Sequence, residues 1–587
     1  MALLFGLAIV EPIRSLSASN SISHEIVVSG IEGSDFAKVR STFNDASLLR
    51  AAKSQKFRST SNFRAHVKSD ADLMRRVLRS NGYYAAKVTT RIASSDNRLR
   101  VELIVLPGSR YVFGHIEFEF QGSTPATDII VEFEKHIDLT YGSPAIATDF
   151  IAAESRLSDS LSGLGFPFAQ KVKHDLVVDH QTKQLNITFI VEPGTRRRMG
   201  RVFFKGSDAV KKSYLRRFII WQEKEYFQQD FITNLRTSLL QTSLFSQVSI
   251  DLVSREKDYV DISITVAEAA PRTIGASAGY STAEGVSTEV FWEHRNMFAR
   301  GSLLKLTARG AEIEQSFSGQ LELPHFARLN QTLSFESLFR RQNTDAFLSY
   351  EAELRANIDR VITSNFALQA GGVVEYSDVT DTEGDRDFLI ASLPLGIRWD
   401  SSDDLLNPTQ GLRASLITSP ASNLTSNNFS FLKSEFRSSA YFSFHESKNI
   451  VLALRARVGS IVGVSSEALP ATHRFFAGGG GSIRGFSFQR VGPLDAEDDP
   501  TGGRSVVEFA AEARLKVNRD IGIVPFIEGG NAYRDQLPQF SNFRWGVGIG
   551  ARYHTNFGPI RFDLAMPLDR QPDEGRFQIY ISLGQAF

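Results

Sequence analysis

The chain has 587 residues, no cysteine, and 66 basic against 66 acidic side chains. This length exceeds that of one compact domain, and the absence of cysteine excludes disulfides and Cys-ligated metal centres. The balanced charge gives no global reason to expect a nucleic-acid partner. The mean hydropathy of −0.16 does not exclude a membrane barrel, because barrel strands alternate apolar and polar side chains, and an aromatic content of 11% favours β structure or contact with lipid.

The first 22 residues contain an apolar run from Ala2 to Val10, followed by the small-residue site Leu16-Ser17-Ala18. The run is too short for a membrane-spanning helix, which needs about 20 apolar residues, but it has the length of a secretory signal core. We predict that residues 1–22 are a signal-like segment. The alternative is that they belong to the folded protein, because no basic residue precedes the run.

Three internal repeats follow, each with a strand of alternating apolar residues at Leu99–Val105, Leu185–Val191 and Val260–Val266. Apolar residues at helical spacing precede each strand, so every repeat is predicted to have the order β-α-α-β-β. The predicted limits are residues 23–109, 110–196 and 197–269. This arrangement resembles POTRA domains, the soluble repeats that precede certain outer-membrane barrels. The alternative is three generic α+β modules.

The sequence pattern changes at residue 270. Helical periodicity ends there, and sixteen segments of alternating apolar and polar residues extend to residue 587. In residues 504–517, Val507 and Phe509 share one face while Glu508, Glu512 and Arg514 share the other. A soluble β-sandwich would give the same alternation. An even number of strands and charges on a common face favour a closed, 16-stranded transmembrane β-barrel, because an open edge in lipid leaves backbone groups without partners.

The predicted strands follow one another at short intervals, except that a connection of 42 residues, 462–503, separates the eleventh from the twelfth. Its core is similar to the loop-six motif of the superfamily that includes BamA, TamA and the two-partner secretion transporters. The resemblance implies that this loop folds back into the barrel and that Arg484 is its anchoring cation, with Glu512 and Glu528 as partners on the inner wall. The matching positions are Arg474, Gly478, Gly479, Ser482, Ile483, Arg484, Gly485 and Phe486.

A second motif of the same superfamily stands at Phe526–Gly530, where Glu528 replaces the usual Asp. Further matches occur at Asn407–Gly411 and Phe557–Asp563, and the terminal Phe587 resembles the C-terminal signal of outer-membrane proteins.

Three repeats before a barrel of this size resemble the TamA branch, whose members are outer-membrane subunits of a translocation and assembly module. The resemblance implies a Gram-negative outer membrane, POTRA repeats in the periplasm, and a periplasm-spanning, inner-membrane-anchored partner of the TamB type. It also implies a role as an insertase for unfolded outer-membrane proteins such as autotransporters. The alternative is a polypeptide-secretion pore of the two-partner type.

We expect an insertase to open laterally where the first strand, Arg272 to Thr282, meets the last strand, Arg576 to Phe587. Gly584 weakens pairing there, because glycine adds backbone entropy and no side-chain packing.

No motif for covalent or metal chemistry stands out. Gly478 to Gly481 lacks the Lys-Ser/Thr of a phosphate-binding loop, and neither a Gly-x-Ser-x-Gly nor a His-Glu-x-x-His pattern occurs. We therefore expect no catalytic activity, cofactor or metal.

Overall fold

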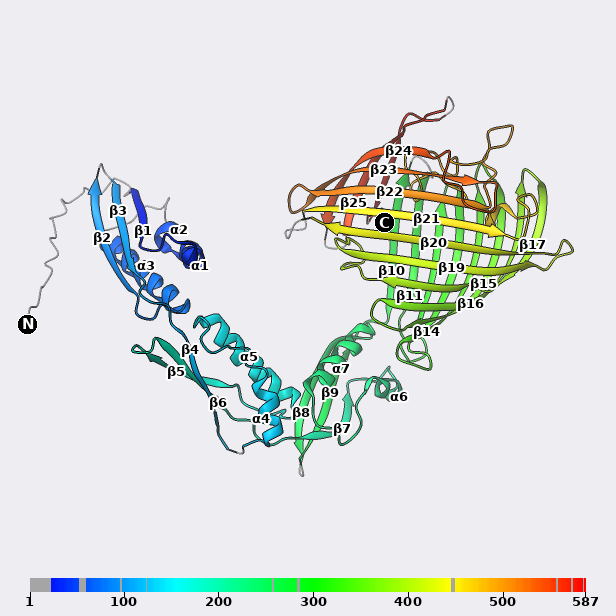
Figure 1. Cartoon of the computed structure of the whole chain (residues 1–587). Coiled ribbons are helices and arrows are strands. Elements are labelled where there is room, and N and C mark those ends of the chain that lie inside the picture. The colour runs from blue at the N-terminus through cyan, green and yellow to red at the C-terminus, as the bar shows by residue number, and fades with distance from the viewer. Residues whose placement is uncertain are drawn as a thin grey trace, which may run out of the picture. The chain divides into compact units, whose positions relative to one another are not determined.

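The computed structural model describes residues 23–51, 60–95, 98–122, 124–255, 258–281, 285–444, 449–555, 558–571, 574–583 and 585–586 (Figure 1). The signal-like segment 1–22 and the seam residues Thr282, Gly584 and Phe587 lie outside these ranges. No helix within them has both the length and the apolar character needed to cross a bilayer.

Three small α/β units precede the barrel, and each has the expected order of elements. The first contains β1 (Ser23–Ser29), η1 (Ser34–Phe36), α1 (Ala37–Ala46), α2 (Leu48–Ala51), α3 (Thr60–Ser80), β2 (Lys87–Ser95) and β3 (Arg98–Leu106). The second contains β4 (Val112–Phe120), α4 (Thr127–Glu134), α5 (Ala147–Gly163), β5 (Lys173–Asp179) and β6 (Gln184–Val191). The third contains β7 (Arg198–Lys205), α6 (Lys212–Leu215), η2 (Arg216–Phe218), α7 (Gln229–Gln241), β8 (Phe245–Arg255) and β9 (Tyr259–Glu268).

Each unit has a three-stranded sheet with its last strand in the centre, in the orders β1-β3-β2, β4-β6-β5 and β7-β9-β8. The first strand pairs in parallel with the last in the first two units, which requires the intervening helices as a crossover. The alternating apolar residues of the central strands are buried, as Leu185, Ile187, Phe189 and Val191 illustrate. The predicted fold class of these units is confirmed.

Seventeen strand segments form the closed antiparallel barrel. They are β10 (Arg272–Ser281), β11 (Gly285–His294), β12 (Leu303–Ala311), β13 (Glu314–Leu323), β14 (Gln331–Asn343), β15 (Leu348–Val361), β16 (Phe366–Asp381), β17 (Gly384–Ser392), β18 (Leu395–Asp400), β19 (Gly411–Asn423), β20 (Phe429–Ser443), β21 (Ile450–Val462), β22 (Ser505–Lys516), β23 (Ile521–Tyr533), β24 (Arg544–Thr555), β25 (Gly558–Pro567) and β26 (Gln578–Leu583).

The segments β17 and β18 are one strand interrupted at Pro394. The register with β16 is the same on both sides of the gap, since Ser392 faces Val373 and Leu395 faces Ala370. Proline has no amide hydrogen for the ladder, so it breaks the pairing without shifting it. The barrel therefore has sixteen strands, as the sequence predicts.

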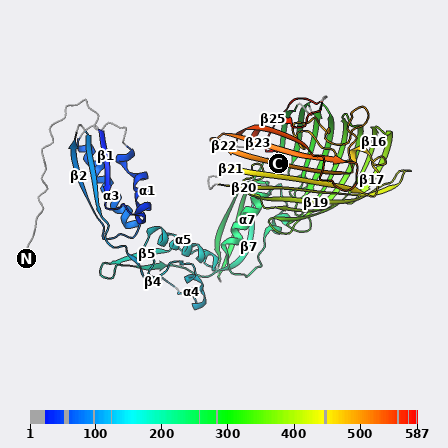
Figure 2. The same ribbon diagram turned by 45° about the horizontal axis from the view of Figure 1, so that its top comes forward.

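The two faces of the barrel differ as expected from the alternation. Outward side chains such as Phe339, Leu354 and Ile549 are apolar and exposed, whereas Glu508 and Glu512 of β22 are buried inside. Figure 2 shows β22 and β23 side by side in this wall, in agreement with their register.

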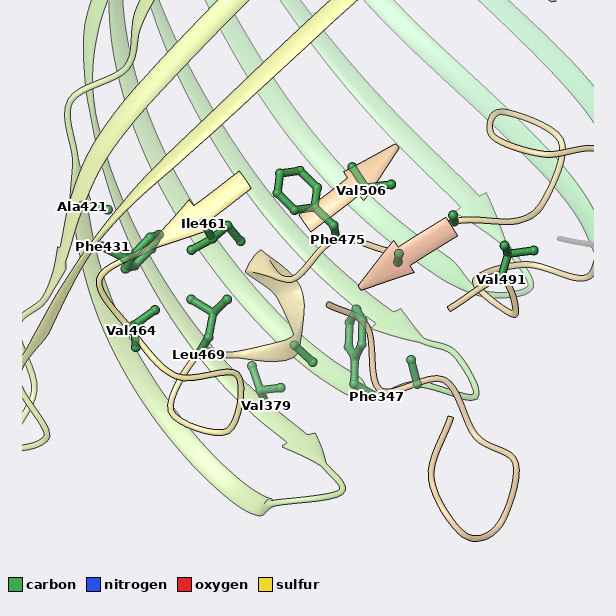
Figure 3. Close-up of a cluster of buried hydrophobic side chains, with 14 of the residues drawn as sticks. Phe347, Val379, Ala421, Phe431, Ile461, Val464, Leu469, Phe475, Val491 and Val506 are labelled. Atoms are coloured by element: carbon green, nitrogen blue, oxygen red, sulfur yellow. The ribbon is translucent and has the colours of Figure 1, made fainter. Parts of the chain in front are cut away.

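The long connection spans residues 463–504, one residue later than predicted, because β21 ends at Val462 and β22 begins at Ser505. It contains one short helical turn, η3 (Ala471–His473). Its Leu469 and Phe475 pack with Phe431 and Ile461 of the strands in a buried apolar cluster (Figure 3). The fold-back loop thus has a dry core of its own with the inner wall.

Candidate functional site

The side chain of Arg484, at the inner end of the fold-back loop, is completely buried and meets three carboxylates. Its Nη2 donates to Glu512 Oε1 at 2.6 Å and to Glu528 Oε1 at 2.7 Å, and its Nη1 donates to Asp563 Oδ2 at 2.5 Å. These partners come from three strands, β22, β23 and β25. One guanidinium therefore joins the loop to most of one barrel wall.

Glu528 uses its two oxygens differently. One accepts from the Arg484 guanidinium, and the other accepts from the Arg484 backbone amide at 2.7 Å. The carboxylate therefore fixes both the side chain and the main chain of the loop. Beneath the guanidinium lies the ring of Phe526, with its centroid 3.5 Å from Cζ, a favourable cation–π geometry in a desolvated place.

Further arginines surround this cage. Asp563 also pairs with Arg552, and it lies 3.4 Å from Arg561 Nε, while Glu512 accepts from Arg514 Nε at 3.2 Å. With Arg484, four guanidinium groups meet the three carboxylates. Buried ions are tolerated only when they are paired, so removing Arg484 would leave Glu528 buried without a cation within 4.0 Å among the described residues.

Glycines make room for the loop backbone at this wall. Gly485 has φ +103°, a left-handed conformation that favours glycine, and an added Cβ there would lie 2.9 Å from the Met566 carbonyl carbon. On β24, a Cβ at Gly546 would lie 2.0 Å from the Arg484 carbonyl oxygen. Glycines in both the loop and the wall therefore allow the two backbones to approach each other closely.

The loop also contacts the last strand. The Tyr580 hydroxyl on β26 accepts from the Gly485 amide at 3.2 Å and donates to the Phe486 carbonyl at 3.3 Å. The ring of Phe486 is buried, and the Arg544 guanidinium lies over it at 4.7 Å. Neither Tyr580 nor Asp563 is among the partners of the loop expected from the sequence.

The remaining motif residues shape the loop itself. The Ser482 hydroxyl accepts from the Gly478 amide at 2.9 Å and donates to Glu508 Oε1 at 2.5 Å. The Gly479 amide donates to the Ile483 carbonyl at 3.2 Å, closing the turn. Gly530 lets β23 approach β22, because a Cβ there would lie 2.2 Å from the Val507 carbonyl oxygen.

Arg474 anchors the other end of the motif to a different wall. Its Nη2 donates to Asp381 Oδ2 at 2.9 Å, and its Nε and Nη1 donate to the carbonyls of Leu469 and Thr501. Next to it, His473 Nε2 lies 3.2 Å from Glu375 Oε1. Asp381 and Glu375 belong to β16, so the loop is fixed to two walls of the barrel.

The seam between the first and last strands is short. Within the described residues, β10 and β26 pair only at Tyr280 with Ile581 and at Ser281 with Tyr580. The adjoining pairs are longer, since β25–β26 has six residue pairs and β10–β11 has ten. Arg272, predicted at the seam, pairs with His294 of β11, and among the described residues it has no partner on β26.

No group of three His, Asp or Glu side chains in the described ranges is arranged to hold a metal ion. The cage of Arg484 consists of guanidinium groups that are ion-paired with carboxylates, while Arg484 Nε and Arg561 Nε make no hydrogen bond. The arrangement is that of a structural anchor for the loop.

Comparisons with known proteins find similar sequences and a similar fold. Residues 296–587 match the family model described as the Omp85 superfamily domain. The outer membrane protein assembly factor BamA of Nitratidesulfovibrio vulgaris is 26% identical over 552 residues, which cover 86% of this chain and 66% of that protein. BamA of Neisseria meningitidis serogroup B is 20% identical over 581 residues, which cover 86% of this chain and 71% of that protein. The chain thus spans about two thirds of the length of these curated relatives.

Among solved structures, the crystal structure of BamA from Haemophilus ducreyi lacking POTRA domains 1–3 has a TM-score of 0.68 at 17% identity, covering 80% of this chain and 99% of that one. This likeness supports the fold of the barrel and of the repeats before it. Both of these relatives are named BamA, and the narrower TamA resemblance is not confirmed. The chain is an outer-membrane β-barrel protein with periplasmic POTRA-type units, and residues 296–587, which include most of its barrel, are similar to the Omp85 superfamily domain.

Proposed function

We propose that this protein is an outer-membrane assembly factor that inserts other barrel proteins by opening laterally between β10 and β26. The observation that carries the proposal is the seam, where two residue pairs join strands that have six and ten pairs with their other neighbours. Each missing pair leaves backbone donors and acceptors without a strand partner. An incoming strand can supply them at little cost in hydrogen bonds.

The position of the unpaired part suits a substrate that arrives from the periplasm. Strand β10 begins at Arg272, directly after the third POTRA-type unit, and among the described residues it pairs with β26 only at its far end, Tyr280 and Ser281. Residues 272–279, for which the described part of the last strand shows no partner, therefore lie at the end of β10 that follows the third POTRA-type unit in the chain. This edge of the barrel offers backbone hydrogen bonds to a strand that arrives from the periplasm.

The fold-back loop supports an insertase more than a secretion pore. Residues 463–504 are held to the inner side of the barrel by a dry apolar cluster and by ion pairs with two parts of the wall. A polypeptide crossing the lumen would have to displace these contacts, whereas opening at the seam leaves the cage of Arg484 in place. Two-partner secretion is accordingly the weaker alternative.

A disulfide across the seam tests the proposal. The chain has no cysteine, so Tyr280→Cys with Ile581→Cys introduces the only thiols. The matched control is Tyr553→Cys with Ile560→Cys, which replaces the same residue types at a paired, outward-facing position of β24 and β25. Both proteins are reconstituted in vesicles, and insertion of an unfolded outer-membrane barrel protein is followed by its protease resistance.

Oxidation is expected to abolish assembly by the seam variant, and reduction should restore it, while the control pair remains active in both states. If the oxidised seam variant assembles substrate as well as its reduced form, lateral opening is wrong. If neither wild type nor control promotes insertion, the assembly function itself is wrong. Translocation of a polypeptide through the oxidised seam variant would favour the secretion pore.

The narrower TamA assignment adds a TamB-type partner and autotransporter substrates, and we retain it as a separate proposal with POTRA limits of 23–109, 110–196 and 197–269. Its partner would add a strand to an edge of a POTRA sheet, such as β1 or β2. Photocrosslinking from residues 24–109 in intact cells tests it. Capture of a periplasm-spanning, inner-membrane-anchored protein is expected, and capture of periplasmic assembly-complex subunits alone would contradict the TamA branch.

A further inference from the structure

A basic and aromatic site lies on the outer surface of the barrel, away from the loop and the seam. Arg341 on β14 faces outward, because it continues the outward row of Phe335 and Phe339. It lies between Gln315 of β13 and Tyr350 of β15 in the ladder. Few charged side chains share this face, since the outward rows of β13 to β15 are otherwise apolar or uncharged except for Arg360.

The height of Arg341 in the membrane follows from the strand directions. Strand β14 is the fifth in an alternating series that starts on the POTRA side, so it ends at the opposite rim, which faces the cell exterior. On β15, the outward residues Ala352, Leu354, Ala356 and Ile358 separate Tyr350 from Arg360. Ten residues at ~3.4 Å each, tilted by roughly 40°, span about 26 Å, close to the ~25 Å apolar band of such barrels. Arg341 therefore lies at the level of the outer-leaflet headgroups.

The guanidinium of Arg341 is held but lacks a counter-charge. Its Nη1 donates to Gln315 Oε1 at 2.8 Å, and its Nε donates to the Tyr350 hydroxyl at 3.4 Å. In the described part of the barrel no carboxylate oxygen lies within 4.0 Å of it, although Asp378 is the ladder neighbour of Tyr350 on β16. The adjacent Arg340, which faces inward, pairs with Glu351 at 2.5 Å. Of the two neighbouring arginines, Arg340 thus has a carboxylate partner, whereas Arg341 is held by uncharged groups alone.

An apolar hollow of about 530 Å³ adjoins the guanidinium. Its outward walls are Phe317, Phe339, Tyr350 and Tyr376, each about half exposed. Aromatic rings at the level of the headgroups contact both the acyl chains and the polar layer. The hollow therefore offers apolar contact directly beneath an unpaired cation.

We propose that Arg341, with Gln315 and Tyr350, binds the phosphate group of an outer-leaflet lipid whose acyl chain lies against Phe317, Phe339 and Tyr376. A phosphate supplies the missing counter-charge and accepts from the free Nη2 of the planar guanidinium, which matches phosphate geometry. Gln315 and Tyr350 orient the guanidinium. The site would fix one lipid to β13–β16, a part of the wall remote in sequence from the seam.

Native mass spectrometry of the full-length protein in detergent tests this. The probe is a phosphorylated, acylated diglucosamine lipid, compared with the same lipid without phosphate and with inorganic phosphate as a competitor. Arg341→Gln should weaken retention of the phosphorylated lipid by about tenfold, as expected for a lost charge-assisted interaction. Arg341→Lys should lose less, because the charge is retained. Arg355→Gln, an inward arginine of β15 that lies 2.8 Å from Glu353 and does not line the hollow, is the control and should bind like wild type.

Equal retention by Arg341→Gln and wild type would overturn the proposal. Equal retention of the lipid without phosphate would also overturn it, since the acyl chains alone would then account for binding. Displacement of the lipid by equimolar inorganic phosphate would show that free phosphate is the ligand and would exclude the lipid. The heat-dependent shift in electrophoretic mobility confirms that each variant is folded.

Discussion

The wall that binds Arg484 and the seam one strand away hold the barrel together in opposite ways. At the wall, buried ion pairs link the loop to β22, β23 and β25, and at the seam two residue pairs join β10 to β26. The two regions meet at Tyr580, which bonds to the loop and pairs with Ser281 across the seam. The ion pairs of Arg484 therefore lie on strands near the seam, and none of them joins β10 to β26.

This difference explains how a closed barrel can open at one place. Backbone pairs in a sheet act together, so a strand with many pairs leaves only with its neighbours, while a strand edge with few pairs separates alone. The cage of Arg484 keeps β22 to β25 and the loop together as one body. Opening is thereby confined to the β10–β26 edge.

The largest effect is expected when the buried cation of the wall, Arg484, is removed. Arg484→Ala leaves Glu512, Glu528 and Asp563 buried without their shared cation, and we expect a loss of about 3–5 kcal/mol in the free energy of unfolding. Denaturant titration in detergent measures it. Arg437→Ala, which removes an exposed arginine beside Glu435, should cost at most about 1 kcal/mol. Equal losses in the two variants would show that the cage has no special role in stability.

A smaller effect comes from filling the space at the wall. Gly546→Ala places a Cβ 2.0 Å from the Arg484 carbonyl oxygen, so the loop backbone or β24 must shift. Such overpacking typically costs about 1–3 kcal/mol. Gly372→Ala on β16, where the nearest atom would be 4.0 Å away, is the matched control and should be nearly neutral. Unfolding curves that coincide for the two variants would contradict the close approach of loop and wall.

The smallest effect concerns the residue where wall and seam meet. Tyr580→Phe removes the hydroxyl that bonds to Gly485 and Phe486, and we expect a loss of about 1 kcal/mol. Because β26 is then less restrained, oxidation of the seam cysteine pair should also become slower or less complete. Tyr553→Phe, whose hydroxyl lies on an exposed outward side chain, should change neither quantity. If disulfide formation is unchanged in Tyr580→Phe, the loop does not restrain the seam.

The sequence predicts the architecture because its information is periodic. Alternation over sixteen segments and three repeats of β-α-α-β-β give the fold class, and the interruption at Pro394 does not disturb the count because the register continues. The motif also gives Arg484, Glu512 and Glu528, which the structure brings together.

Other parts of the site depend on which strands become neighbours. Asp563 is an acidic residue that faces inward between the outward Phe562 and Leu564. It ends the Phe557–Asp563 motif match, so its role as a partner of the loop could have been predicted from the sequence. Asp381, the partner of Arg474, is 93 residues away in the chain, so its role emerges only when the barrel closes. The short pairing at the seam likewise reflects the closure of the whole barrel, which no local pattern encodes.

Amide hydrogen exchange of the full-length protein in a bilayer tests the central claim most directly. In β10, the amides of residues 272–279 that point toward β26 should exchange far faster than those of β22 and β23 beside Arg484, because only the seam opens in the native state. Fast exchange confined to β10 and β26, with the β22–β25 wall protected, is the result that the account predicts. Equal protection at the seam and at the wall, or exchange of both at one common rate, would contradict it.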